Sequence, residues 1–346
     1  MTGNISTVDL FCGAGGLTYG FEQAGLPVKA GYDIDPACKF AYEYNTNAEF
    51  VLEDVERVHG SDLERHFSGS SIKVLAGCAP CQPFSSYSRR YADKQSRWKL
   101  LRDFARLVLE CQAEIVSMEN VLQVKHHPVF REFTQQLEKL DYLLEVYEVN
   151  CLDYGAPQSR KRLILLASKL GKINLIQPTH SIDKYKTVRN TIEKLEPLKA
   201  GQASKVDRLH QCSKLSPLNL KRIRASKPGG TWRDWSTDLI AKCHKKETGK
   251  TYPAVYGRME WDQPSPTITT QCFGFGNGRF GHPEQDRAIS LREAALLQTF
   301  PANYEFVDPK EPISIDRVGK LIGNAVPVKL GEVIAQSILE HIQNNT

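Results

Sequence analysis

The sequence of 346 residues has no long apolar run. Its longest apolar stretches, such as residues 163–167, are far shorter than the roughly 18 residues that a membrane span needs. The N-terminus lacks the basic stretch followed by an apolar one that marks a signal peptide. Repeats and low-complexity tracts are also missing, and the 41% hydrophobic and 25% charged fractions are ordinary for a globular chain. These absences exclude a coiled coil and a disordered chain, and they predict a soluble, cytoplasmic protein without a membrane partner.

A disulfide framework is also missing. The nine cysteines are odd in number and scattered along the chain. Without an export signal they are predicted to be reduced thiols.

The net charge of +5 is small, but it is unevenly distributed. Residues 171–288 contain 21 Lys and Arg against 11 Asp and Glu, a net charge of +10. The remaining chain carries 24 against 29, a net charge of −5. A basic segment on an acidic body is expected when one domain handles nucleic acid; a solvated basic face is the alternative.

Residues 1–170 alternate strand-like runs with amphipathic patterns, which predicts a mainly parallel sheet with helices on both faces. The last two strands are separated only by residues 150–161, too short a link for a helical crossover, so they are expected to pair antiparallel. The strands are expected at residues 6–11, 28–33, 50–53, 72–77, 114–118, 143–149 and 162–168.

The remaining chain is expected to form two further parts. The pattern dissolves into loops over residues 171–288, and helical periodicity returns in two closing helices. We therefore expect a first domain over 1–170, an irregular second domain over 171–288, and two closing helices within 289–346.

A glycine-rich segment, residues 13–16, follows the first predicted strand. Glycines let a backbone turn sharply and approach a ligand closely. Asp33 ends the second strand twenty residues after Gly13, where an acid can accept hydrogen bonds from ribose hydroxyls. The full dinucleotide fingerprint would require glycine in place of Thr18. The pattern favours a nucleoside-type cofactor without a pyrophosphate, and a purely structural turn is the alternative.

Two cysteines, Cys78 and Cys81, follow the fourth predicted strand. They could form half a zinc site, but no second pair has suitable spacing because Cys243 and His244 are adjacent. They could be a redox pair, although such motifs normally open a helix and Pro83 suggests a loop. The third interpretation, which we favour, is that one cysteine is a nucleophile at the carboxyl end of a strand, where open α/β sheets bind ligands.

The fifth predicted strand ends near Glu119, so neighbouring strand ends carry a thiol and a carboxyl group. A buried glutamate near a thiolate can stay protonated and donate a hydrogen bond. Further along, Arg160 and Arg162 share one face of an extended run. Taken singly, the segment that contains Glu119 is also compatible with a helix N-cap. The basic run that contains Arg160 and Arg162 is also compatible with a solvated edge.

Together and in this order, these segments resemble the cytosine-C5 DNA methyltransferase family, which uses S-adenosylmethionine (SAM). The resemblance covers residues 5–170 and 288–340. It implies a Rossmann-like α/β methyltransferase fold with a mixed sheet, in which residues 1–170 form the catalytic, SAM-binding domain. Residues 171–288 would form a smaller irregular target-recognition domain, and residues 289–346 would return to the catalytic domain. It is carried by residues 9–16, 80–82, 119–121, 158–162, the pair Arg292 and Glu293, and residues 323–326.

The resemblance implies a SAM pocket. The family usually has Glu at the position of Asp33 and often a large aromatic residue at Ile34, so Ile34 gives a weaker face for the adenine. Ala325 stands where the family often has Ser. The matching positions are Phe11, Gly13, Ala14, Gly15, Gly16, Asp33, Ile34, Asp54, Val55, Pro80, Leu100, Asn324 and Ala325.

The resemblance also assigns catalytic roles and no metal. Cys81 would add as a thiolate to cytosine C6, which makes C5 enamine-like. Glu119 would hydrogen-bond or protonate N3. Arg160 and Arg162 would hold the base carbonyl and Glu119 in place.

The implied partner is double-stranded DNA, from which the target cytosine is flipped out. Residues 85–99 resemble the loop that closes over the flipped base, and Ser85, Arg89, Arg90 and Arg97 are expected to contact phosphates. In the second domain, Arg233, Arg258 and Arg279 are candidates for base readout, because arginine commonly reads guanine. Within the family, the sequence is similar to methyltransferases of prokaryotic restriction-modification systems. This implies a monomer and a cognate restriction endonuclease in the same system, with no stable complex between the two.

Two other functions compete with this one. A tRNA cytosine-C5 methyltransferase shares the fold, but that branch typically has Cys-Phe-Thr where this chain has Cys272, Phe273 and Gly274. A non-catalytic DNA-binding relative is disfavoured because Cys81 and Glu119 are intact. Replacing Cys78 tests the redox interpretation. A redox pair needs this thiol, whereas a methyltransferase should largely keep its activity without it.

Overall fold

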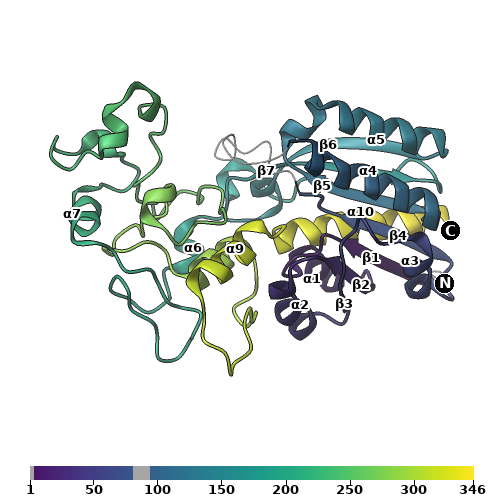
Figure 1. Ribbon diagram of the computed structural model, residues 1–346, viewed down its shortest axis with the longest axis horizontal. Coiled ribbons are helices and arrows are strands. Elements are labelled where there is room, and N and C mark those ends of the chain that lie inside the picture. The colour runs from purple at the N-terminus through teal and green to yellow at the C-terminus, as the bar shows by residue number, and fades with distance from the viewer. Residues whose placement is uncertain (1–3, 81–93) are drawn as a thin grey trace. The chain divides into compact units, whose positions relative to one another are not determined.

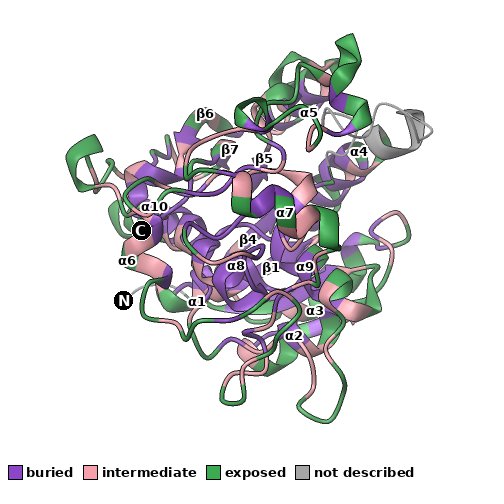
Figure 2. Cartoon of the chain, turned by 90° about the vertical axis from the view of Figure 1, so that its left-hand side faces the viewer, coloured by how far each residue is buried: buried purple, intermediate pink, exposed green. Residues whose placement is uncertain are grey.

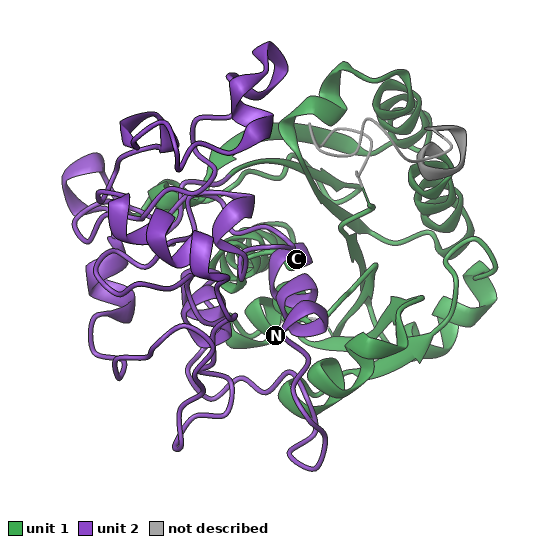
Figure 3. Cartoon of the chain, turned by 60° about the vertical axis from the view of Figure 1, so that its left-hand side comes forward, with its two compact units in different colours: residues 1–154, 161–179, 325–346 green, residues 155–160, 180–324 purple. Residues whose placement is uncertain are grey.

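The computed structural model describes residues 4–80 and 94–346. Within the second range, side chains are described from residue 99 onward. The chain divides into two compact units (Figure 3). Unit 1 comprises residues 1–154, 161–179 and 325–346, and unit 2 comprises residues 155–160 and 180–324. These packing boundaries differ from the expected ones, because residues 155–160 and 289–324 pack within unit 2. The division into catalytic and target-recognition parts stays a prediction.

Unit 1 is built on a seven-stranded mixed sheet in the order β3-β2-β1-β4-β5-β7-β6 (Figure 1). The strands from β3 to β5 pair in parallel, whereas β7 is antiparallel to both β5 and β6. The strands are β1 (Ile5–Leu10), β2 (Val28–Asp33), β3 (Glu49–Leu52), β4 (Ile72–Gly77), β5 (Ile115–Asn120), β6 (Leu143–Asn150) and β7 (Lys161–Ser168).

Helices cover both faces of this sheet. Val8 and Leu10 of β1 belong to the hydrophobic core that α3, α4 and α5 close, whereas Asp9 between them bonds Thr18 of α1. Successive strand residues point to opposite faces, so β1 is buried from both sides along its whole length (Figure 2). The helices of unit 1 are α1 (Gly16–Gln23), α2 (Lys39–Asn45), α3 (Gly60–Phe67), α4 (Lys94–Cys111), α5 (Pro128–Lys139) and α10 (Val328–Asn345).

The antiparallel pairing of β6 and β7 confirms the expectation from their short link. The chain turns between them through a 3₁₀ segment, Cys151–Tyr154, and through Gly155, whose φ of 84° is in the left-handed region. A parallel pair would need a crossover of a dozen residues or more.

The last helix, α10, packs against α1. A Cβ on Gly20 would lie only 2.4 Å from the Val328 carbonyl oxygen. The two helices therefore approach each other more closely than a side chain at this position would allow.

Unit 2 consists of short helices joined by loops, as the composition predicted. In the part of the chain that the structure describes, its strand pairing is limited to isolated bridges such as Pro228 with Arg258. The helices are α6 (Val188–Ile192), α7 (Pro217–Ala225), α8 (Leu291–Leu297) and α9 (Ile315–Asn324).

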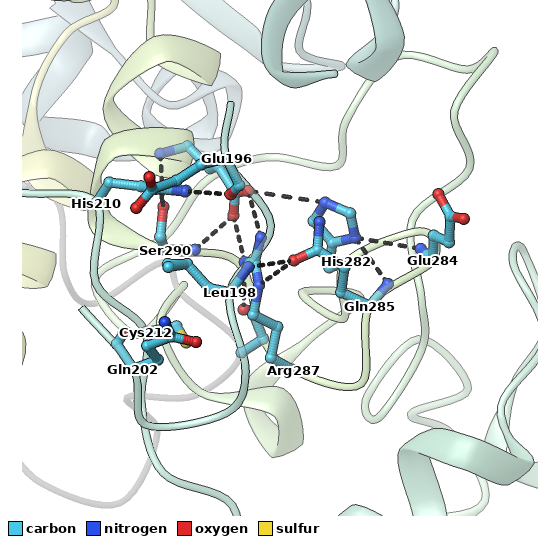
Figure 4. Close-up of polar contacts among 12 residues, drawn as sticks. Glu196, Leu198, Gln202, His210, Cys212, His282, Glu284, Gln285, Arg287 and Ser290 are labelled. Carbon is cyan, nitrogen blue, oxygen red and sulfur yellow. Dashed lines mark hydrogen bonds and ion pairs between the residues drawn. The ribbon is translucent and has the colours of Figure 1, made fainter. Parts of the chain in front are cut away.

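A buried ionic network stabilises unit 2 in place of a sheet (Figure 4). Arg287 is fully buried and donates to both carboxylate oxygens of Glu293 at 2.7 Å. Glu293 also closes the capping box of α8 with Ser290. Burial by itself would raise the pKa of Glu293, but the hydrogen bonds and charge of Arg287 outweigh it and lower the pKa. Burial lowers the pKa of the neighbouring His282 to about 4, so His282 is neutral near pH 7.

Glu293→Gln is expected to destabilise the protein by about 3–5 kcal/mol, because it leaves the Arg287 charge buried without its partner. Urea denaturation followed by tryptophan fluorescence would measure the loss. The matched control is Asp316→Asn, which breaks the exposed ion pair with Lys320 and should cost at most about 0.5 kcal/mol. Equal losses for the two variants would contradict a special role for the buried pair.

Candidate active site

The glycine-rich turn after β1 brings backbone N–H groups to the end of β2. Gly13 and Gly15 have φ values of 54° and 86°, which glycine adopts without strain. The Gly13 N–H donates to Asp33 Oδ2 at 2.9 Å, and the Asp35 N–H donates to Oδ1 at 2.9 Å. Burial raises the pKa of Asp33, and these two hydrogen bonds oppose the rise. The Asp33 carboxylate is therefore held in a fixed orientation beside the turn.

Phe11, in the same turn, has a φ of 59°. A bulky residue in the left-handed region is strained, and such strain often occurs at ligand-binding sites. Gly16 begins α1 and Ala14 is buried. The structure thus brings Phe11, residues 13–16 and Asp33 together, as the sequence predicted.

An open pocket lies at the ends of β2 and β3. Ile34 is 65% exposed and supplies an apolar wall, and Leu52 pairs in register with Asp33. The sequence predicted Ile34 and Asp54 but missed the other lining residues. Leu52 and Glu53 could have been found from their position at the end of the third strand. The pocket is lined by Ile34, Leu52, Glu53, Asp54 and Arg57.

The remaining predicted cofactor residues are placed as follows. Val55 is buried, and its carbonyl accepts a hydrogen bond from Arg106 at 3.2 Å. Pro80 is exposed after β4 and Leu100 is half-buried in α4. Asn324 is exposed at the end of α9 in unit 2, and Ala325 is the buried first residue of the final stretch of unit 1.

Glu119 is a buried carboxylate near the end of β5, with only 2% of its surface exposed. The Cys78 thiol donates to Oε2 at 2.8 Å. Arg162 of β7 places Nε 2.9 Å from Oε1, but Oε1 accepts no hydrogen bond from the described residues. A buried oxygen without a hydrogen bond lowers the free energy of unfolding unless a ligand donates a hydrogen bond to it. Glu119 is thus aligned by two neighbours and keeps one acceptor available.

Asn120 fixes the strand end that carries Glu119. Its amide donates to the Ala79 carbonyl at 3.3 Å, and its side-chain oxygen accepts from the Val121 N–H at 2.8 Å. The residues that follow β4 and those that end β5 are therefore tied together. The sequence analysis gave Asn120 no role of its own.

The predicted arginines differ in their surroundings. Arg162 lies beside Glu119 in unit 1, whereas Arg160 belongs to unit 2, where it is buried and donates to the Ile268 carbonyl at 3.2 Å. Arg258 is 5% exposed and its guanidinium bonds four backbone carbonyls and Asp286. Arg258 therefore stabilises unit 2 and does not present a free guanidinium for base readout, while Arg233 remains exposed.

Several predicted residues lie outside the described residues: Cys81, Ser85, Arg89 and Arg90. Arg97 lies in α4, but its side chain is not among those described. The nucleophile and the DNA-contacting loop stay predictions. Over residues 4–80 and 94–346, no group of three His, Cys, Asp or Glu residues could hold a metal ion, and no helix could span a membrane.

Asp9 is a buried carboxyl group that the sequence analysis did not single out. It is 1% exposed, and Thr18 donates to its Oδ2 at 2.7 Å. Its other oxygen has no hydrogen-bond partner in the described part of the chain. Burial raises the pKa of Asp9 from 3.8 to about 7; the Thr18 hydrogen bond opposes the rise and the charge of Asp33 adds to it.

The stability of the protein is therefore expected to fall as the pH rises from about 4 to about 7. Within that range the folded state holds the Asp9 proton and the unfolded chain does not, so raising the pH favours unfolding. Asp9→Asn keeps an acceptor for Thr18 and cannot ionise. It should raise the free energy of unfolding by about 2–3 kcal/mol more at pH 8 than at pH 5, because Asp9 ionises in the folded state between these two values. Urea denaturation at both pH values measures this; equal shifts at both would contradict it.

The whole chain, and not only this site, can be compared with known proteins. The sequence profile described as C-5 cytosine-specific DNA methylase matches residues 5–340. The chain belongs to this family. The predicted enzyme class, a DNA cytosine-C5 methyltransferase, is thereby confirmed.

The methylase has similar relatives over almost its whole length. It is 50% identical to the type II methylase M.HgiDII of Herpetosiphon aurantiacus, over 98% of this chain and 96% of that protein. It is 31% identical to the type II methyltransferase M1.HphI of Haemophilus parahaemolyticus, over 97% of this chain and 87% of that protein.

Solved structures share the fold of the methylase. An E. coli protein described as a prophage-encoded DNA modification methyltransferase matches with a TM-score of 0.74 and 22% identity, over 98% of this chain and 100% of that chain. The Dnmt2 methyltransferase of S. pombe matches with a TM-score of 0.60 and 18% identity, over 98% of both chains. The predicted α/β methyltransferase fold is confirmed, and methyltransferases of this kind generally use SAM.

Proposed function

We propose that this methylase transfers a methyl group from SAM to C5 of a flipped-out cytosine in a specific duplex DNA sequence. The observation that carries the proposal is Glu119, a buried carboxylate aligned by Arg162 with one oxygen left for a ligand. The relatives of this methylase, M.HgiDII and M1.HphI, are type II enzymes. This supports a role for the methylase beside a cognate restriction endonuclease.

The residues at the ends of β1, β2 and β3 fit SAM. A Cβ on Gly13 would meet nothing within 4 Å, so the turn borders open space. The Asp33 oxygens each accept one backbone hydrogen bond and keep lone pairs for the ribose hydroxyls. Ile34 offers an apolar wall for the adenine, and Asp54 lines the same pocket. When bound, SAM supplies the methyl group.

The chain's own residues activate the cytosine. The Cys81 thiolate forms a bond to C6, and the displaced electron pair moves toward N3, where Glu119 hydrogen-bonds or protonates the ring. Arg162 holds Glu119 during this addition. After C5 has been methylated, a base removes the C5 proton, and Cys81 leaves as the thiolate, which restores the aromatic ring.

Residues 217–258 of unit 2 are proposed to contact DNA phosphates. They carry 10 Lys and Arg, of which Arg222 and Arg258 are buried, against 3 Asp and Glu. These residues surround a small apolar core that includes Trp232 and Trp235. A hydrogen bond from Ser236 lowers the pKa of Asp238, and the charges of Lys221 and Lys245 lower it further, so two separate segments bring lysines to one place. Phosphate contacts would make binding weaken steeply with salt.

Incubation with SAM and unmethylated plasmid DNA, followed by bisulfite sequencing, tests the proposal. We expect 5-methylcytosine at one recurring sequence. Methylation of tRNA and not of DNA would instead support the competing RNA function. Duplex DNA with 5-fluorocytosine at the target should form a denaturation-resistant adduct with the protein, because fluorine cannot leave as a cation. If the protein methylates ordinary DNA but forms no such adduct, the covalent mechanism is contradicted and the methyltransferase function is not.

A further inference from the structure

Cys78 is a thiol beside the candidate active site that no proposed catalytic step uses. It directly follows β4, and its backbone N–H donates to the Leu10 carbonyl at 3.3 Å. Parallel β4 and β5 place Gly77 opposite Met118, so the next residues, Cys78 and Glu119, are neighbours across the sheet. This register brings the Cys78 sulfur to 2.8 Å from Glu119 Oε2.

The direction of this hydrogen bond follows from the chemistry of the two groups. A carboxyl oxygen that carries no proton can only accept, so the Cys78 S–H donates to Oε2. The terminal torsion of a glutamate is soft, because sp³–sp² torsions have broad energy wells. A carboxyl group at the end of a strand therefore needs contacts on its oxygens to keep one orientation.

Each oxygen of Glu119 has a different neighbour. Cys78 bonds Oε2, whereas Arg162 lies near Oε1 in an ion pair without hydrogen-bond geometry. Of these two neighbours, the thiol and not the guanidinium donates a hydrogen bond to the carboxylate. The charge of Arg162 attracts the carboxylate, and the directional S–H contact sets its rotation.

We propose that Cys78 is a positioning residue for methyl transfer, whose thiol holds Oε2 so that Oε1 faces the cytosine ring. The inference rests on the proposed function, since it gives Cys78 a role through Glu119. It also separates the two cysteines of the motif: Cys81 reacts with the base, and Cys78 orients the acid.

Single-turnover methyl transfer by Cys78→Ala and Cys78→Ser tests this role. Cys78→Ala should lower the rate constant about 3- to 10-fold, the effect of losing one modest hydrogen bond, while the Kd values for SAM and DNA change less than about 2-fold. Cys78→Ser restores a donor and should recover most of the rate. Cys111→Ala, a buried thiol outside the site, is the control for thiol removal and should keep the wild-type rate.

A Glu119→Ala background distinguishes positioning from general packing, because it leaves no acceptor for the Cys78 thiol. If Cys78 acts through the carboxylate, adding Cys78→Ala to Glu119→Ala should lower the residual rate less than about 2-fold. An undiminished penalty in that background, a wild-type rate for Cys78→Ala, or a Cys78→Ser variant no better than Cys78→Ala would each overturn the inference. A wild-type protein that transfers no methyl group would instead overturn the proposed function itself.

Discussion

Cys81→Ser is expected to abolish methyl transfer, with a loss on the order of 10³-fold or more, because covalent catalysis is removed. A cysteine with a pKa of about 8.5 is partly ionised near neutral pH, and a serine hydroxyl is not. Serine is close to cysteine in size, so the fold should be unchanged. Transfer of tritiated methyl groups to DNA under single-turnover conditions measures the loss.

Binding measurements separate this chemical effect from a structural one. The Cys81→Ser variant should bind target DNA and SAM with affinities close to those of the wild-type protein. It should form no adduct with DNA that carries 5-fluorocytosine. Turnover near the wild-type rate would show that another group is the nucleophile. Cys212→Ser, which alters a buried thiol in unit 2 whose S–H donates to the Lys199 carbonyl and can be replaced by a hydroxyl donor, is the control for the substitution itself.

Glu119→Gln is expected to lower the rate of the chemical step about 10²-fold or more, the usual contribution of general acid catalysis. The amide can still donate a hydrogen bond to N3 but cannot transfer a proton, so residual activity should remain. The substitution also removes the ion pair with Arg162. Single-turnover rates and equilibrium SAM binding should be measured side by side.

The Kd for SAM should change little in Glu119→Gln, because the predicted cofactor residues cluster around Gly13 and Asp33. If SAM affinity and rate fell by equal factors, Glu119 would belong to the cofactor site. A melting temperature close to that of the wild-type protein would show that loss of the Arg162 pair has not disturbed the fold.

Local patterns in the sequence predicted much of the sheet. The short link between β6 and β7 excludes a crossover helix and thus requires antiparallel pairing, which the structure has. The turn at residues 13–16 and the acid at Asp33 were predicted from their positions after strands, since parallel strands bring their carboxyl ends to one edge. Only the strand ends differ, as for β5, which runs to Asn120 instead of residue 118.

Other features depend on contacts between residues far apart in the chain. Arg258 was a candidate for base readout, but it donates to four carbonyls of residues that are 24 to 35 positions away in the chain. The packing of residues 289–324 within unit 2 could not be read from periodicity, because an amphipathic helix shows that one face is buried and not against what. Sequence spacing likewise carries no information about the burial of Asp9.

By itself, the sequence determined the alternation of strands and helices along residues 1–170, the antiparallel edge, and the chemical groups available at the strand ends. These follow from short-range rules of backbone geometry, side-chain alternation and link length. Only the tertiary structure decided which oxygen of Glu119 is bonded, which arginine lies beside it, and which charges are buried together as Arg287 and Glu293 are. These depend on the register between strands and on loop packing, where shifts of about one ångström make or break a hydrogen bond.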